Sequence, residues 1–358
     1  MNKNPRLYFI DALRAFAIIM MLQGHFISGL LDPSFKDPSN PFYNFWLYCR
    51  GFTAPIFFTI TGWIFTFLLL KNPIQGWGNP RIKKGIKRGI ELIIWGYLLR
   101  LNLPMLFKGH INHSFYYPDV LHIIGLSLLF ILFCYLLFGQ LKRWLGFLFL
   151  LMGILIFLGQ PLYVDLEFSH LPTFLAAYLT KANKGVFYLF PWLGYVSIGA
   201  FIATVFNSKT NRLWGWSLGF ILMGLTLIYY SSSLFIQMEQ YSGISLFRRV
   251  AYNNFLFIRL GDVLLLFGGF MLLNRYLSRS LFTKIGSKTL EIYIVHYFIL
   301  YGSLFGIGLF KYFSYSWSFS MSICGAIIFI IACVGLVILD DRYRTPMIRY
   351  ILRRLTLK

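Results

Sequence analysis

The chain has 358 residues, of which 58% are hydrophobic, 20% are aromatic and only 13% are charged, and its formal net charge is +21. Apolar runs of roughly 20 residues recur along it, each long enough to cross a hydrocarbon layer about 30 Å thick, and this excludes a soluble globular protein. The basic residues are dispersed among short connectors, which excludes a nucleic-acid partner. The sequence therefore predicts an all-α, polytopic membrane protein with one domain over residues 1–358.

About ten membrane spans are predicted in chain order, from the length of the apolar runs and the polarity of the connectors. Connectors on the side of the N-terminus carry roughly three times as many basic residues as those on the opposite side, which predicts that both termini are cytoplasmic. The first run is expected to be a retained span, because it holds charged residues and lacks a small-residue cleavage site. The spans fall near residues 7–31, 46–70, 90–107, 119–138, 144–162, 185–205, 214–233, 254–273, 290–310 and 317–339.

The first predicted span carries three ionisable residues, Asp11, Arg14 and His25. Asp11 and Arg14 are three residues apart and share a helix face. His25 follows Arg14 by eleven residues, and eleven steps of about 100° return almost to the same direction, about 16 Å further along the helix. Such groups in a span usually mark a polar interior or pathway. The alternative is a buried Asp11–Arg14 pair that only fixes packing, with His25 bonded to a neighbouring hydroxyl.

Other titratable residues lie at the predicted outer ends of spans. Arg50 begins the second span near the depth of His25, unless its side chain snorkels to the interface. His110 and His113 have a spacing that a metal could use, but they lack a closed ligand set, so no metal is predicted. In the eighth span, Arg259 and Asp262 repeat the i, i+3 pairing and are interpreted as an internal salt bridge, with a ligand role as the alternative.

Five stretches, in order along nearly the whole chain, carry a resemblance to a known superfamily. The opening "RLYFIDALRAFAIIMMLQGHF" and "RGFTAPIFFTITGWIFTFLL" resemble the transmembrane acyltransferases, which include the acyltransferase-3 proteins and the heparan-α-glucosaminide N-acetyltransferase group. The later stretches "DVLHIIGLSLLF", "FPWLGYVSIGAF" and "SKTLEIYIVHYFILYG" are similar to the second group in particular. The resemblance implies an acyl-CoA-dependent enzyme that moves acetyl from cytoplasmic acetyl-CoA to a sugar hydroxyl or amine on the far side of the membrane.

The resemblance also implies roles for the first helix. Arg14 and His25 match the arginine and histidine of the acyltransferase-3 opening motif, in which the histidine is regarded as catalytic. In the heparan-acetylating group that position looks more like an asparagine, and the functional histidine further along has no match here. Histidine can act as general base or hold the acyl group, and we favour the general base. Arg14 would steady the donor, and Asp11 would hold Arg14.

The resemblance and the chemistry of the residues together suggest which side chains contact the donor and the acceptor. The basic run from Arg81 to Gly89 is expected to receive the phosphates of CoA, or alternatively to anchor the chain on anionic lipid. His296 is expected one to two turns from the cytoplasmic end of the ninth span, where it could contact the donor, with a packing role as the alternative. Arg50, Asp119 and His122 are expected to meet the acceptor sugar. The cations of the basic run are Arg81, Lys83, Lys84, Lys87 and Arg88.

Two other classes of protein compete with the enzyme. A secondary transporter or lipid-moving protein could use the same intramembrane charges, although no inverted repeat or paired broken helices are evident. An inert membrane scaffold explains the apolar chain but not the charged stripe. The enzyme is expected in the cytoplasmic (inner) membrane of a bacterium, in contact with membrane lipid, and a homo-oligomer is compatible with the sequence.

Overall fold

The computed structural model describes residues 7–181, 187–206, 213–277 and 281–356, with side chains described as far as Arg342. Within these ranges the chain is all-α and forms no β-strand, which confirms the predicted fold class. The α-helices are α1 (Tyr8–Leu30), α2 (Pro41–Arg50), α3 (Thr53–Leu70), α4 (Pro80–Arg100), α5 (Leu103–Phe107), α6 (Val120–Phe138), α7 (Lys142–Leu158), α8 (Gln160–Tyr163), α9 (Thr173–Leu179), α10 (Leu189–Val205), α11 (Leu213–Ser242), α12 (Ser245–Tyr252), α13 (Phe255–Leu272), α14 (Leu281–Ser287), α15 (Thr289–His296), α16 (Leu309–Phe313) and α17 (Phe319–Thr356).

Among the described residues, six helical segments are long and apolar enough to cross a membrane. Each of the ten predicted spans coincides at least in part with helix, but four do not meet this criterion. Of these, α10 is a shorter apolar helix, as is the stretch Thr289–Tyr301. The membrane character of the chain is thus clear, and the number of about ten spans stays a prediction. The six segments are Tyr8–Leu30, Pro41–Leu70, His113–Phe138, Leu213–Ser242, Phe255–Arg275 and Phe319–Arg342.

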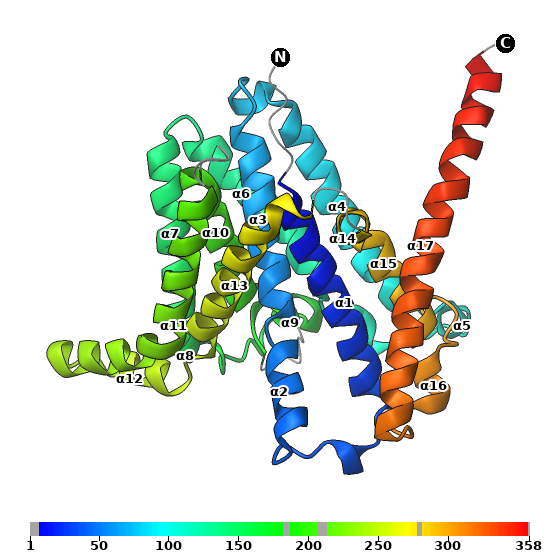
Figure 1. Cartoon of the computed structure of the whole chain (residues 1–358), viewed down its shortest axis with the longest axis horizontal. Helices are drawn as coiled ribbons and strands as arrows, with labels where there is room; N and C mark the ends of the chain where they lie inside the picture. Colours follow the sequence, from blue (N-terminus) through cyan, green and yellow to red (C-terminus); the bar gives the residue numbers. More distant parts are fainter. Residues whose placement is uncertain (1–6, 182–186, 207–212, 278–280, 357–358) are drawn as a thin grey trace.

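Helix α1 lies among α3, α13, α14 and α17, while α10 packs between α3 and α7 (Figure 1). Two glycines bring the backbones of α3 and α10 together. A Cβ atom at Gly62 would lie 2.0 Å from the carbonyl oxygen of Val196, and one at Gly199 would lie 2.0 Å from that of Thr59. Small residues at such crossings allow the close backbone packing that stabilises helices in membranes. The crossing fixes the position of α3, which forms part of the cavity wall described below.

The ninth predicted span is not one continuous helix. After α14 and α15, the chain forms a π-helix over Tyr297–Tyr301 and leaves the helical conformation at Gly302. Gly302 and Gly306 have φ values of +68° and +69°, in the left-handed region that favours glycine. A Cβ atom at Gly302 would lie 2.3 Å from the backbone of Ile307. The apolar run 290–310 therefore contains a sharp reversal that its hydropathy does not reveal.

Backbone hydrogen bonds tie this reversal to the ends of α1 and α4. Leu103 N–H donates to the carbonyl of Leu304 at 2.8 Å, and Leu304 N–H donates to that of Leu101 at 3.0 Å. In the same way, Trp317 N–H donates to the carbonyl of Leu30 at 2.9 Å. We call the segment 302–317, together with the ends of α1 and α4 that it bonds, the rim. The segment 302–317 thereby joins two helices that are far apart in the sequence.

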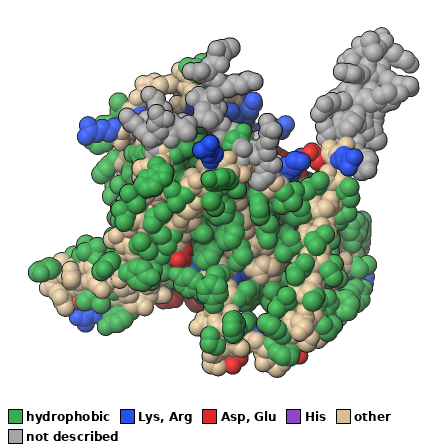
Figure 2. Space-filling model, in the orientation of Figure 1, with side chains coloured by type: hydrophobic (Ala, Val, Ile, Leu, Met, Phe, Trp, Pro, Cys, Tyr) green, Lys and Arg blue, Asp and Glu red, His purple; other side chains and the backbone are tan. Residues whose placement is uncertain are grey.

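Both described ends of the chain lie at the opposite end of the bundle from the rim (Figure 1). Lys and Arg side chains gather at that end in Figure 2, whereas the broad middle of the surface is hydrophobic. This is the pattern that the positive-inside rule describes. A cytoplasmic orientation of this end remains a prediction.

Candidate active site

A cavity of about 760 Å³ opens inside the bundle, and α1, α3, α4, α6 and α15 contribute to its wall. Arg14 and His25 both line it, and because eleven residues of one helix separate them, the cavity extends about 16 Å along α1. The structure thus brings these two predicted residues to one wall, as the helical periodicity indicates. We call the two regions the Arg14 end and the His25 end. Asp11 is not part of the lining.

At the Arg14 end, the first helix meets α14 and α15. Nη2 of Arg14 donates a hydrogen bond of 2.7 Å to the hydroxyl oxygen of Thr289, the first residue of α15. One turn earlier, the backbone of Asp11 approaches Gly286 so closely that a Cβ atom there would lie 1.7 Å from the Asp11 carbonyl oxygen. Asp11 therefore stands where α1 and α14 cross. Its position fits a role in holding the Arg14 end together.

The basic run forms the first turns of α4 and not a connector. Asn79 caps this helix by accepting a hydrogen bond from the N–H of Arg81, and Pro80 occupies the first helical position, so the helix starts before the cations. Arg88 is the member of the run that lines the cavity, and its guanidinium lies 3.2 Å from the carboxylate of Glu91. The remaining cations are exposed and do not line the cavity; they are Arg81, Lys83, Lys84 and Lys87.

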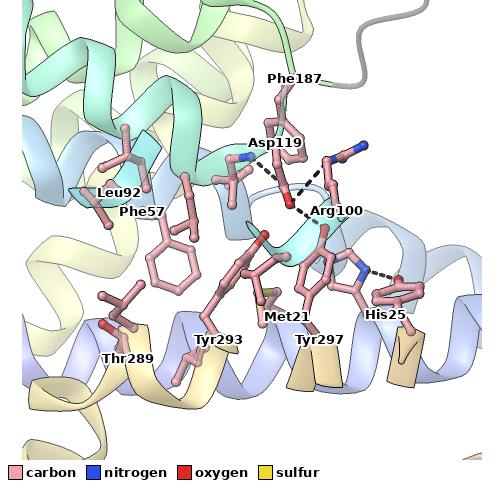
Figure 3. Close-up of a pocket in the computed structure, with 18 of the residues that line it drawn as sticks. Met21, His25, Phe57, Leu92, Arg100, Asp119, Phe187, Thr289, Tyr293 and Tyr297 are labelled. Carbon is pink, nitrogen blue, oxygen red and sulfur yellow. Dashed lines mark hydrogen bonds and ion pairs between the residues drawn. The ribbon is translucent and has the colours of Figure 1, made fainter. Parts of the chain in front are cut away.

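At the His25 end, two hydrogen-bonded groups lie side by side (Figure 3). Nδ1 of His25 is 2.9 Å from the hydroxyl of Tyr301. One turn away, the hydroxyl of Tyr297 donates to the Asp119 carboxylate, whose Oδ2 is 3.8 Å from Nε of Arg100. All five side chains line the cavity. The His25 end of the cavity therefore brings together an imidazole, a carboxylate and a guanidinium.

Asp119 and His122 have different positions, although both were predicted to meet the acceptor. Asp119 is the N-cap of α6 and lines the cavity. His122 is fully buried, and its Nδ1 accepts a hydrogen bond of 2.8 Å from the backbone N–H of Asp119. Its ring packs against Tyr97, with a centroid distance of 4.3 Å. His122 therefore completes a capping box and does not reach the cavity.

His296 is close to His25. Its ring centroid is 5.5 Å from that of His25, and it is fully buried outside the cavity lining. Since α15 begins at Thr289, beside Arg14, seven residues of helix carry His296 about 10 Å further, to the level of His25. A contact between His296 and the donor therefore stays a prediction, although the ring lies beside His25 and outside the cavity lining.

Arg50 ends α2 and lines the cavity beside His25. It packs against α1, since a Cβ atom at Gly24 would lie 3.1 Å from Cγ of Arg50. Its guanidinium donates to the hydroxyl of Ser28 and lies 5.7 Å from the ring centroid of Trp46. The side chain is exposed, and it contacts both α1 and Trp46.

Sequence reasoning missed four residues of this site, namely Arg100, Thr289, Tyr297 and Tyr301. The last three lie in the quoted stretch "SKTLEIYIVHYFILYG". The spacing of Tyr293, Tyr297 and Tyr301 by four residues places three hydroxyls on one helix face, a signal that was available. Arg100 had no such signal, because its partner Asp119 belongs to a different helix.

The remaining titratable candidates have structural or peripheral positions. Arg259 and Asp262 form the predicted salt bridge at 3.1 Å, and the hydroxyl of Tyr48 donates to the same carboxylate at 2.7 Å. Neither Arg259 nor Asp262 lines the cavity. His110 and His113 are exposed. Within the described ranges, no group of three or more His, Cys, Asp or Glu residues is placed to hold a metal ion.

The fold and the cavity define a helical membrane protein whose interior holds a histidine, several arginines and a carboxylate. The family model described as "Heparan-alpha-glucosaminide N-acetyltransferase, catalytic" matches residues 6–241. The chain therefore belongs to this family of membrane N-acetyltransferases, which confirms the resemblance seen in the sequence. No individual curated protein matches the chain at a significant level. The match includes His25, Arg100 and Asp119, whereas Tyr297 and Tyr301 lie beyond it.

Proposed function

We propose that the chain transfers an acetyl group from cytoplasmic acetyl-CoA to an amino or hydroxyl group of a glycan or amino sugar on the opposite side of the membrane. The observation that carries the proposal is the single cavity lined by Arg14 at one end and His25 at the other. In a family of N-acetyltransferases, such a cavity offers a path from a water-soluble donor to an acceptor beyond the bilayer. We place this enzyme in the cytoplasmic membrane of a bacterium.

The donor would enter at the Arg14 end. CoA phosphates are too strongly charged to enter hydrocarbon, so they would stay near Arg88 and the exposed cations of α4. The pantetheine arm is thin, and the middle of the cavity offers apolar walls that include Ile18, Met21 and Phe57. Arg14 is positioned to hold a carbonyl of this arm while Thr289 orients its guanidinium. The thioester would then approach His25.

His25 would act as general base. With the proton on Nδ1, the ring donates to the Tyr301 oxygen and leaves the Nε2 lone pair free. Nε2 takes the proton of the acceptor amine or hydroxyl while that atom attacks the thioester carbonyl carbon. The tetrahedral intermediate then collapses, the C–S bond breaks, and His25 returns the proton to the leaving thiolate of CoA. The alternative is attack by His25 itself, with an acetyl-imidazole between two half-reactions.

The first test measures acetyl-CoA binding and CoA release by the purified protein. We expect wild type to bind acetyl-CoA and release CoA slowly, and to do so faster with an acceptor. His25→Ala should still bind acetyl-CoA, but its rate of CoA release should fall at least about 100-fold, the usual loss when a general base is removed. Arg14→Ala should weaken binding. The exposed His170 provides a matched control, and His170→Ala should behave as wild type.

Two outcomes would contradict the proposed function. If folded wild-type protein binds no acetyl-CoA, the acetyltransferase proposal is wrong and the cavity should be tested as a transport path. A transporter would move its substrate across a vesicle membrane without consuming a thioester. If His170→Ala and His25→Ala lose release equally, the role of His25 is wrong.

A further inference from the structure

Helix α4 places the five cations of the basic run in two rows. Arg81, Lys84 and Arg88 follow one another at spacings of three and four residues, so they lie on one side of the helix. Lys83 and Lys87 form a second row, about 100° around the helix from Lys84 and Arg88. The first row ends at the cavity, which Arg88 lines. The second row, which we call the lysine row, is exposed and does not line the cavity.

The packing of α4 against α6 shows which way the lysine row faces. A Cβ atom at Gly89 would lie 3.0 Å from the carbonyl oxygen of Gly125, and one at Gly96 would lie 2.5 Å from the ring of His122. These two glycines of α4 therefore lie against α6. The lysine row is about 150° around the helix from them. It therefore faces away from the bundle.

The lysine row continues toward the rim as an apolar strip. Ile90, Ile94 and Leu98 lie on the same side of α4, and all three are exposed. From Lys83 to Leu98 the row and the strip together measure about 22 Å along the helix. This length is close to half of the about 40–45 Å that a bilayer measures with its head groups. The exposed side of α4 thus matches one phospholipid in length and in the order of charged and apolar parts.

Among the described residues, the lysine row has no acidic partner. The ion pairs in these ranges include neither Lys83 nor Lys87. Glu91, one turn beyond Lys87, pairs with Arg88 at 3.2 Å. Like charges four residues apart on a helix repel each other. A phosphate bound between the two ammonium groups would remove this repulsion and accept charge-assisted hydrogen bonds from both.

The loop before α4 carries a residue typical of a membrane interface. Trp77 lies three residues before α4 begins, and it is 74% exposed. Asn79 holds this loop, because its side-chain amide donates to the carbonyl of Leu69 at 3.0 Å and to the hydroxyl of Tyr135 at 3.1 Å. Tryptophan is enriched where a membrane meets water. The start of α4 lies at the end of the bundle opposite the rim (Figure 1), so this interface is on the predicted cytoplasmic side.

We propose that the lysine row and the apolar strip bind one anionic phospholipid of the cytoplasmic leaflet. The two ammonium groups bind its phosphate, and an acyl chain packs along the strip. The phosphates of CoA would instead meet the row that ends at Arg88, so the donor and the lipid use different sides of one helix. This lipid site does not depend on the proposed acetyl transfer.

The test titrates the purified protein in detergent with dioctanoyl phosphatidylglycerol and follows the unfolding temperature. We expect this lipid to raise the unfolding temperature of wild type in a saturable way, and dioctanoyl phosphatidylcholine to do so much less. In the double variant Lys83→Gln and Lys87→Gln, the affinity for phosphatidylglycerol should fall about 30-fold. Each cation near an anionic lipid contributes about 1 kcal/mol, and two together correspond to that change.

The matched control is the double variant Arg81→Gln and Lys84→Gln. It removes the same charge from the first turns of α4 but from the other row, and it should keep the wild-type affinity for phosphatidylglycerol. If the two double variants lose affinity equally, the basic run attracts anions diffusely and the proposal is wrong. The unfolding temperature of each variant without lipid shows whether it is folded.

Two further measurements distinguish the lipid from a soluble phosphate. Glycerol 1-phosphate has the charge but no acyl chain, so it should stabilise wild type much less than phosphatidylglycerol at the same concentration. Equal stabilisation would show a site for soluble phosphate and overturn the proposal. Acetyl-CoA binding should be weakened more by Arg88→Gln than by loss of the lysine row. If loss of the lysine row weakens acetyl-CoA binding and leaves lipid binding unchanged, the row serves the donor and the proposal is wrong.

Discussion

The hydroxyl of Tyr301 lies 2.9 Å from Nδ1 of His25, across 276 positions of the sequence. Tyr301 closes the π-helix, one residue before the chain leaves the helical conformation at Gly302. The ring that we propose as the base is thus oriented by a residue at the edge of a reversal. Any change at Tyr301 should alter the orientation of His25 before it alters the fold.

Tyr301→Phe removes this hydrogen bond with little change in volume. We expect acetyl transfer to fall about 5-fold in kcat, because a hydrogen bond worth about 1 kcal/mol no longer fixes the imidazole. The KM for acetyl-CoA should stay within about two-fold, since the donor end is distant. Tyr312→Phe, at an exposed residue of α16, is the control. A rise in KM without a loss of kcat would show that Tyr301 contacts a substrate instead.

Arg88→Gln and Lys84→Gln separate the two interpretations of the basic run. Arg88 lines the cavity, whereas Lys84 is exposed on the same helix. We expect Arg88→Gln to raise the KM for acetyl-CoA about 10-fold, through loss of a charge-assisted contact with a phosphate. Lys84→Gln should change it about two-fold or less. Equal effects of both substitutions would favour a diffuse electrostatic role of the whole run.

Gly62→Ala should destabilise the crossing of α3 and α10. The added Cβ atom would lie 2.0 Å from the carbonyl oxygen of Val196, so the helices must move apart. Overpacking of this kind costs about 3 kcal/mol at the upper end of its usual range, and the unfolding temperature in detergent should fall clearly. Gly219→Ala in α11 is the matched control, because nothing lies within 4 Å of its Cβ position. Alanine there should be neutral or stabilising. An unchanged unfolding temperature for Gly62→Ala would show that the crossing is looser than described.

Asp262→Asn tests whether the pair with Arg259 is structural. The Asp262 side chain is only 8% exposed, and breaking a buried pair costs about 3 kcal/mol. We therefore expect a lower unfolding temperature and an unchanged KM for acetyl-CoA at a temperature where the variant is folded. Tyr48→Phe removes one hydrogen bond to the same carboxylate and should cost about 1 kcal/mol. A normal unfolding temperature with an altered KM would assign the pair to a ligand.

Sequence reasoning located most helices because apolar length is a local property. It also placed Arg14 and His25 on one face, since helical periodicity relates residues of a single helix. It failed where contacts between distant segments decide the outcome. The contact between the rings of His296 and His25 was not foreseen, because the two residues belong to helices far apart in the sequence. The tyrosine spacing could have placed Tyr301 on a polar face, but not its contact with His25, which belongs to the first helix.

The contacts of Arg100 also could not be predicted from local sequence. An arginine near the end of a span is normally interpreted as an interfacial anchor. Its pairing with Asp119 depends on the packing of α4 against α6, and the Tyr297 contact adds a third segment. Three separate parts of the chain must fold before this group of side chains exists. No local pattern contains that information.

The rim joins α1, α4 and the segment 302–317 by backbone hydrogen bonds, for example between Leu103 and Leu304. Bonds of this kind do not depend on which side chains are present. Side chains beside the rim can therefore be exchanged without loss of these bonds. Exchanging Ser114, which lines the cavity outside the rim, is a route to altered acceptor preference that leaves the backbone hydrogen bonds of the rim intact.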